Sequence, residues 1–155
     1  MPQIAKGGKY IFGWSPVSRH GSIQIPPEAR DEYGLIPGGK VLLTSGSQAT
    51  GGFTVTTRSL LQASALASIL DSCPDLAEYR LDEGQTVRYK GRSYCWAGFS
   101  PDGRLQLSAK TLAAYDVKEG DRLLSIRGSN LAFVMGVRGP LIAHANTHPE
   151  ILVFP

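Results

Sequence analysis

The feature that most constrains the fold of this chain is an internal repeat, in which residues 21–47 recur without a gap as residues 103–129. Polar, aromatic and glycine positions match in register, and the matched pairs include Gln24 with Gln106, Tyr33 with Tyr115 and Gly38 with Gly120. A repeat of this length is one supersecondary unit used twice. A fold predicted for one repeat must therefore also suit the other.

Each repeat predicts the order strand, short helix, strand, strand. In the first repeat, residues 23–25 alternate apolar and polar, which is typical of a strand with one buried face. Pro26 ends that strand because proline has no backbone N–H to donate to a sheet. We expect a short helix from Pro27 to about Tyr33, followed by Gly34 as a left-handed cap. The two remaining strands are expected at residues 40–44 and 53–56.

The duplicated unit begins before this shared core. Residues 6–16 return as residues 90–101 with only Ala97 inserted, and a Lys-Gly dipeptide in each predicts the turn of an additional hairpin. The hairpins are expected to pair residues 4–5 with 10–12 and residues 87–89 with 94–96. We therefore divide the chain into a first repeat with its hairpin, a connector, a second repeat with its hairpin and a C-terminal segment, which span 1–57, 58–84, 85–137 and 138–155.

Residues 58–76 of the connector contain a predicted helix that begins after Ser59 and ends at Cys73-Pro74. Its apolar residues fall on one helical face and are Leu61, Ala65, Leu66, Ile69, Leu70 and Cys73. Ser59 is the expected N-cap, and Pro74 ends the helix because the residue before a proline avoids helical backbone angles. In the C-terminal segment we expect a shorter helix before Pro149 and a final strand at residues 151–154.

The first repeat contains a run that brings a known family into view. Residues 21–41 read Gly-x-Ile-x-Ile-Pro-x-Glu-x-Arg-x-x-x-Gly-Leu-x-x-Gly-x-x-Val and resemble the AbrB/MazE/SpoVT group of DNA-binding domains. The resemblance covers roughly residues 10–57 and again 94–137. It implies a mainly β fold in which the hairpins of two units interlock into one barrel. Because this chain carries both units, we expect a tandem swapped-hairpin barrel formed as an intrachain pseudo-dimer, with the connector helix beside it.

Composition and charge are compatible with that expectation without proving it. The formal net charge is +3 and the pI about 9.0, which suits an anionic partner. No apolar run reaches the 18 residues of a membrane span, so no membrane partner is expected. The two cysteines, Cys73 and Cys95, stand apart and no secretory segment is recognised. We therefore expect buried free thiols in a cytoplasmic protein.

The resemblance implies a non-enzymatic transcriptional regulator that binds double-stranded DNA, mainly through its phosphates. In similar proteins, basic side chains on the loop before the core strand and at the start of that strand meet DNA. At the matching and neighbouring positions the candidate contact residues are Arg19, Arg30 and Arg104, followed by His20, Lys9 and Lys110. A further homodimer and a protein partner stay open.

The pattern departs from the family at several basic positions. The residue after the glycine is Ser22 in the first repeat and Arg104 in the second, and the paired basic residues of the helix are reduced to Arg30-Asp31 and Leu112-Ala113. The alternative hypothesis is a barrel that recognises a protein or a small ligand through its aromatic strands. Convergence of Arg19, Arg30 and Arg104 on one face would favour DNA.

Other chemistry finds little support in the sequence. His144 and His148 have the i, i+4 spacing of two metal ligands, but no third ligand is evident. The chain lacks a Gly-x-Ser-x-Gly motif, and neither cysteine has a histidine neighbour in sequence. We therefore expect no catalytic residues, no metal and no cofactor.

Overall fold

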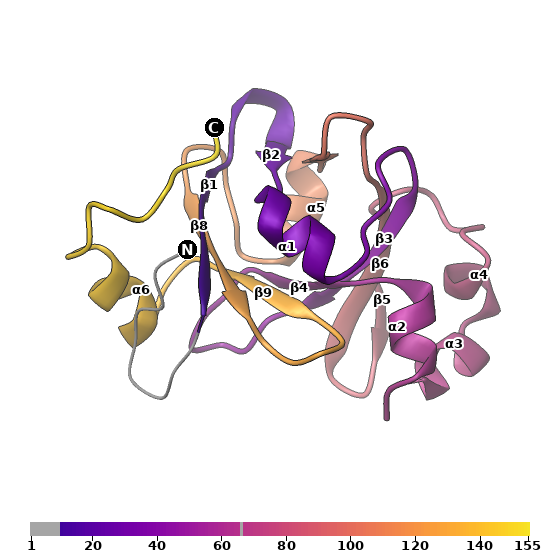
Figure 1. Ribbon diagram of the computed structural model, residues 1–155. Coiled ribbons are helices and arrows are strands. Elements are labelled where there is room, and N and C mark those ends of the chain that lie inside the picture. The colour runs from indigo at the N-terminus through magenta and orange to yellow at the C-terminus, as the bar shows by residue number, and fades with distance from the viewer. Residues whose placement is uncertain (1–9, 66) are drawn as a thin grey trace.

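The computed structural model describes residues 10–65 and 67–155 and has a mainly β fold with short helices (Figure 1). In the first repeat the elements are β1 (Ile11–Pro16), the 3₁₀ turn η2 (Arg19–Gly21), β2 (Ser22–Gln24), α1 (Pro27–Glu32), β3 (Lys40–Ser45) and β4 (Phe53–Thr56). In the second repeat they are β5 (Val87–Tyr89), β6 (Arg92–Gly98), β7 (Arg104–Gln106), α5 (Ala109–Ala114), β8 (Arg122–Arg127) and β9 (Phe133–Gly136). The predicted order of strand, helix, strand and strand is confirmed in both repeats.

The sheet pairing mixes the two repeats. Seven strands form an antiparallel sheet in the order β1-β8-β9-β4-β3-β6-β5, and β2 pairs with β7 in a separate two-stranded ribbon. Among the described residues, the pairs that join neighbours within one repeat are the hairpins β3–β4, β5–β6 and β8–β9. The pairs β1–β8, β3–β6, β4–β9 and β2–β7 each join a strand of one repeat to a strand of the other. Neither repeat therefore builds its sheet alone.

Aromatic side chains from the two repeats complete one core. The ring of Tyr33 lies 5.1 Å from that of Phe133, and the equivalent Tyr115 lies 5.7 Å from Phe53. Each contact joins a tyrosine of one repeat to a phenylalanine of the other, and all four side chains are buried. The Tyr33 hydroxyl also donates to the backbone oxygen of Ser129 at 2.7 Å. Burial of this aromatic area stabilises both repeats together.

The helices α1 and α5 begin and end as the sequence predicts. Pro27 opens α1, and Gly34 follows it with a left-handed φ of 64°. The Ser108 side chain caps α5 by accepting from the Thr111 backbone N–H at 3.1 Å. Both helices bury side chains in the same apolar core as the sheet. No helix in the described ranges is long and apolar enough to cross a membrane.

The connector differs from the single helix predicted for it. Three short helices replace it, namely α2 (Arg58–Gln62), α3 (Ser68–Ser72) and α4 (Pro74–Ala77), and Thr57 rather than Ser59 is the N-cap. Ser64 donates its hydroxyl back to the Leu61 carbonyl at 2.7 Å, and Cys73 leaves helical geometry before Pro74, with φ −132° and ψ 78°. Leu61, Ile69 and Leu70 of the predicted apolar face are buried, whereas Ala65 is exposed and Leu66 lies outside the described residues.

The flanking segments follow their predictions in part. The predicted hairpin of the second repeat is confirmed, because β5 pairs with the start of β6. In the first repeat, residues 4–5 of the equivalent hairpin lie outside the described residues. The short C-terminal helix is α6 (Pro140–Ala145). Instead of a final strand at residues 151–154, the chain makes one parallel bridge between Val153 and Trp14.

The interleaved sheet predicts that the two repeats unfold as one unit. Trp14 lies in the first repeat and Trp96 in the second, so the variants Trp96→Phe and Trp14→Phe each report on one repeat. In urea, the tryptophan fluorescence midpoint of each variant should coincide with its own far-ultraviolet circular dichroism midpoint. A repeat whose fluorescence changes at clearly lower urea than the dichroism would contradict the shared core.

Candidate nucleic-acid interface

The candidate interface is the two-stranded ribbon of β2 and β7. Ser22 pairs with Gln106, Ile23 with Leu105, and Gln24 with Arg104. Ile23 and Leu105 are fully buried and face the core. Because side chains alternate along a strand, the polar residues Ser22, Gln24, Arg104 and Gln106 share the opposite face. One strand of this polar face comes from each repeat.

A glycine before each strand sets the ribbon's close approach to the rest of the chain. Gly21 has a φ of 73°, and a Cβ added to it would lie 1.9 Å from the Leu107 carbonyl oxygen. Leu107 donates its backbone N–H to the Gly21 oxygen, and Ile25 donates to the equivalent Gly103 oxygen, both at 3.0 Å. The invariant spacing of these glycines in the two repeats thus fixes the register of the ribbon.

Arg104 is the most firmly placed cation of the interface. Its Nε donates to the Ser22 hydroxyl at 2.7 Å, and its Nη1 donates to the Gln24 side-chain oxygen and the Pro155 carbonyl oxygen, both at 3.0 Å. The Ser22 and Gln24 side chains are uncharged, and Arg104 makes no ion pair with an aspartate or glutamate side chain within the described ranges. The guanidinium is therefore held in place while its positive charge stays available to an anion.

Arg30 reaches the same end of the ribbon from α1. A Cβ on Gly103, which precedes β7, would lie 3.0 Å from the Arg30 Nη1 and 3.5 Å from the Gln24 Nε2. The Arg30 side chain is about one quarter exposed, and its Nε lies 3.8 Å from a carboxylate oxygen of Asp31. Arg30 of the first repeat and Arg104 of the second thus both adjoin Gln24 and the turn at Gly103.

Arg19 and His20 lie at the other end of the ribbon. Both are exposed on η2, directly before β2. The His20 backbone N–H donates to a carboxylate oxygen of Glu119 at 2.9 Å, and the Gln106 side chain donates to the His20 carbonyl at 3.4 Å. Hence Arg19 stands apart from Arg30 and Arg104, and the arginines bracket the ribbon at its two ends.

The remaining predicted contacts are less informative. Lys110 is exposed on α5 and lines a shallow hollow that also contains Asp82 and Glu83. The acidic neighbours reduce the attraction of this hollow for an anion. Lys9 lies outside the described residues.

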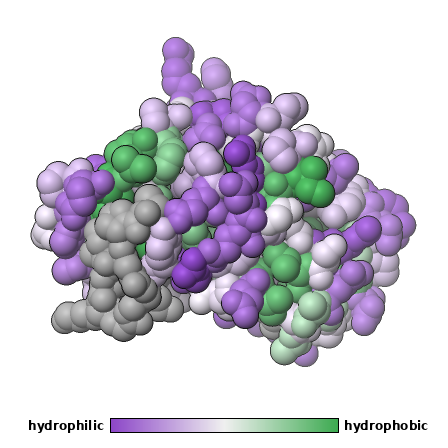
Figure 2. All heavy atoms as spheres, viewed as in Figure 1, coloured by the Kyte–Doolittle hydropathy of each residue, from purple (hydrophilic) through white to green (hydrophobic). Residues whose placement is uncertain are grey.

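The polar face can make the contacts that nucleic acids require. Guanidinium and amide groups donate to phosphate oxygens and to base edges, and amides also accept. On the face of the molecule seen in Figure 2, hydrophilic residues run from the top down the centre, where β2 and α1 lie in Figure 1. The sequence analysis missed Ser22, Gln24 and Gln106 as site residues. Their alternation with Ile23 and Leu105 was the available signal.

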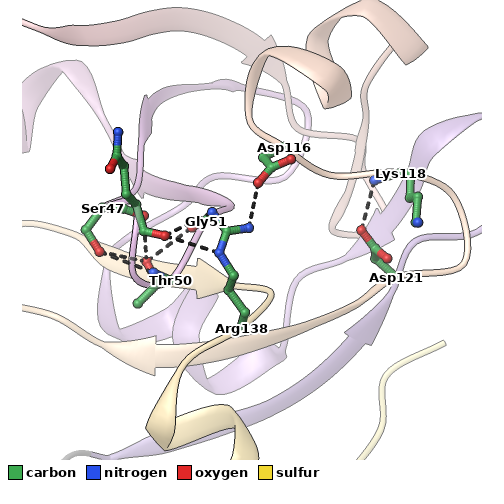
Figure 3. Close-up of polar contacts among 8 residues, drawn as sticks. Ser47, Thr50, Gly51, Asp116, Lys118, Asp121 and Arg138 are labelled. Atoms are coloured by element: carbon green, nitrogen blue, oxygen red, sulfur yellow. Dashed lines mark hydrogen bonds and ion pairs between the residues drawn. The ribbon is translucent and has the colours of Figure 1, made fainter.

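A second polar cluster surrounds Arg138 (Figure 3). Its Nε and Nη2 donate to the Gln48 carbonyl oxygen at 3.1 and 2.9 Å, and its Nη1 contacts a carboxylate oxygen of Asp116 at 2.5 Å. The guanidinium thus lies between the β3–β4 loop of the first repeat and the loop after α5 of the second. With its charge paired to Asp116 and all three of its nitrogens in contacts inside the protein, Arg138 joins the two repeats and offers little to an anionic ligand.

The aromatic strands serve the core. Phe12, Trp14, Tyr94 and Phe99 are buried. Trp96 is half-buried and packs edge-on against Tyr79, with the Lys40 ammonium 5.8 Å from the indole. These rings are therefore occupied by contacts inside the protein.

Nucleophiles and metal ligands are also accounted for by structure. Burial raises the pKa of the Cys95 thiol to about 11, and the Tyr115 hydroxyl contacts its Sγ at 3.2 Å. The rings of His144 and His148 lie 4.9 Å apart, and the His148 Nδ1 is 2.7 Å from a carboxylate oxygen of Glu150. Across the part of the chain that the structure describes, no group of three or more histidine, cysteine, aspartate or glutamate side chains could hold a metal ion.

Comparisons with known proteins add little. Neither protein-family models nor curated protein sequences give a match. Among solved structures, the chain is similar to the solution structure of PHS018 from Pyrococcus horikoshii, with 15% sequence identity, 84% of this chain and 96% of that chain covered, and a TM-score of 0.36. A likeness of this size supports no inference about fold or function.

The burial of Cys95 predicts unequal reactivity of the two thiols. At pH 8 a thiol reagent should modify only the half-buried Cys73 in the native protein, since a thiol with a pKa near 11 is almost entirely protonated. Titration with a chromogenic disulfide should count one thiol in buffer and two in urea. Cys73→Ser should abolish the native reaction, and native labelling of Cys95 at a similar rate would contradict its placement.

Proposed function

We propose that this chain is a non-enzymatic regulator of the AbrB/SpoVT type that binds duplex DNA through the β2–β7 ribbon. The observation that carries the proposal is Arg104, a cation that the neutral side chains of Ser22 and Gln24 hold on a polar ribbon to which both repeats contribute a strand. A folded protein gains little from an arginine whose charge has no acidic partner. Such a group is well suited to a phosphate.

The strand pairing supports the architectural part of the proposal. We infer a tandem swapped-hairpin barrel, in which the repeats act as the two halves of a pseudo-dimer. Its support is that β1, β2, β3 and β4 each pair with a strand of the second repeat. Ile23 and Leu105 of the ribbon also belong to the same buried cluster as Val41 and Leu123 of the larger sheet, so the ribbon covers one side of the core.

Phosphate contacts should dominate the binding. Arg30 and Arg104 at one end of the ribbon and Arg19 at the other would engage the DNA backbone, and Gln24 and Gln106 lie between them. Two acids temper the attraction, since Glu119 adjoins His20 and Asp102 is exposed before β7. We therefore expect modest affinity with a strong dependence on salt.

Recognition of a small ligand through aromatic strands is less favoured. The rings that would line such a site are packed in the core or against Tyr79 and Lys40. An acidic protein partner at the ribbon stays an outcome of the experiment below.

Binding of duplex DNA should depend on Arg104. In fluorescence anisotropy titrations at about 50 mM salt, Arg104→Ala should weaken binding roughly tenfold and lower the slope of log K against log salt by about 1. Arg92→Ala is the matched control. Arg92 begins β6, and this seven-residue strand places it about 20 Å from the end that adjoins the ribbon.

Two results would count against the proposal. No measurable affinity of the unaltered protein for duplex DNA at low salt would remove it. Equal weakening by Arg104→Ala and Arg92→Ala would mean that binding follows overall charge and not the ribbon.

A further inference from the structure

Residues 151–155 form a strap along the outer edge of β1. The Trp14 backbone N–H donates to the Leu152 oxygen at 2.9 Å, and the Phe154 N–H donates to the Trp14 oxygen at 2.8 Å. Figure 1 shows this yellow segment rising beside β1 to end near the top of the molecule, where β2 lies. The strap therefore connects an edge of the large sheet to the candidate interface.

The strap packs closely on β1 at Gly13 but buries few of its own side chains. Gly13 of β1 has a φ of 150°, and a Cβ there would lie 2.5 Å from a Phe154 ring carbon and 2.9 Å from the Leu152 oxygen. Only glycine leaves room for this packing. Ile151 is buried, whereas the Leu152 and Val153 side chains are 55% and 48% exposed. Lifting residues 152–155 would thus disrupt few apolar contacts.

Pro155 of the strap contacts the arginine of the interface. The guanidinium of Arg104 has five N–H donors. Its single Nε–H goes to Ser22, and its two Nη1 hydrogens face two acceptors, the Gln24 side chain and the Pro155 carbonyl. Only the two hydrogens of Nη2 have no hydrogen-bond acceptor among the described residues.

This arrangement limits what Arg104 can offer to a phosphate. A forked contact needs two parallel N–H groups on one edge of the guanidinium, either Nε with Nη2 or Nη1 with Nη2. Each edge has one donor already in use. Ser22 and Gln24 belong to the ribbon itself, so the Pro155 carbonyl is the acceptor that can depart without disturbing the ribbon.

We propose that the strap is a displaceable cover of the interface, which competes with DNA phosphate for the Nη1 group of Arg104. With the strap docked, Arg104 presents Nη2 alone; with the strap lifted, it also presents one hydrogen of Nη1. This inference rests on the proposed function. If the strap only shields the edge of β1, DNA binding should leave the strap in place, and weakening the strap should leave the affinity for DNA unchanged.

Weakening the contact between the strap and Gly13 should strengthen DNA binding. Phe154→Ala removes the ring that lies over Gly13 and should lower the apparent Kd for duplex DNA about fivefold, because the competent fraction of the protein rises. Val153→Ala is the matched control, since that half-exposed side chain takes no part in the Gly13 contact, and its Kd should not change. Circular dichroism checks that both variants fold.

Hydrogen exchange on the unaltered protein tests the displacement directly. The amides of Trp14 and Phe154 make the two hydrogen bonds that hold the strap, so both should exchange faster when duplex DNA saturates the protein. Measurable DNA binding with equal Kd for the unaltered protein and Phe154→Ala, and with unchanged exchange at these amides, would overturn the strap proposal. Absence of DNA binding by both proteins would instead remove the proposed function and the strap proposal with it.

Discussion

The pairing of strands between the repeats is the constraint on which the rest of this structure depends. Within the first repeat β3 pairs with β4, whereas β1 and β2 find their partner strands in the second repeat. In this chain, Tyr33 packs on Phe133 and Tyr115 packs on Phe53, so each repeat contributes side chains that cover the core of the other. The ribbon depends on the same pairing between repeats, since β2 and β7 come from different repeats. A site on the ribbon therefore exists only when both repeats are folded.

Duplication on one chain also allows the two halves to differ. Ser22 and Arg104 occupy the same position in the repeat, and antiparallel pairing brings them within hydrogen-bond distance of each other across the ribbon. Arginine at both positions would place two cations side by side, which is unfavourable. With serine at position 22, the side chain beside Arg104 is a hydrogen-bond acceptor, which orients the single guanidinium of the pair. Two repeats on one chain can carry different residues at this position, whereas a dimer of two identical chains cannot.

Local signals in the sequence predict the elements of each repeat, while contacts distant in sequence decide the rest. The apolar–polar alternation at Ile23, the proline at 26 and the glycine at 34 predict where the strands and the helix of a repeat begin and end. The presence of two repeats suggests that strands of one pair with strands of the other. The end of the connector helix at Cys73 before proline is predicted from the sequence, whereas the bond from Ser64 back to Leu61 inside the connector is not revealed by a helical pattern. For the site, the sequence singles out Arg104 but not its acceptors, because Gln24 and Pro155 reach it only through the fold.

The arginines that join the repeats are used in two ways. Arg127 pairs with Glu32, donating from Nε at 2.7 Å, and Arg138 pairs with Asp116 and the Gln48 carbonyl. Those exposed pairs contribute little to the free energy of unfolding and mainly fix how the loops of the two repeats meet. Arg104 has equally good geometry, but its side-chain acceptors Ser22 and Gln24 are neutral, so they do not cancel its charge. This difference is why we propose Arg104, and not Arg127 or Arg138, as the contact to an anionic partner.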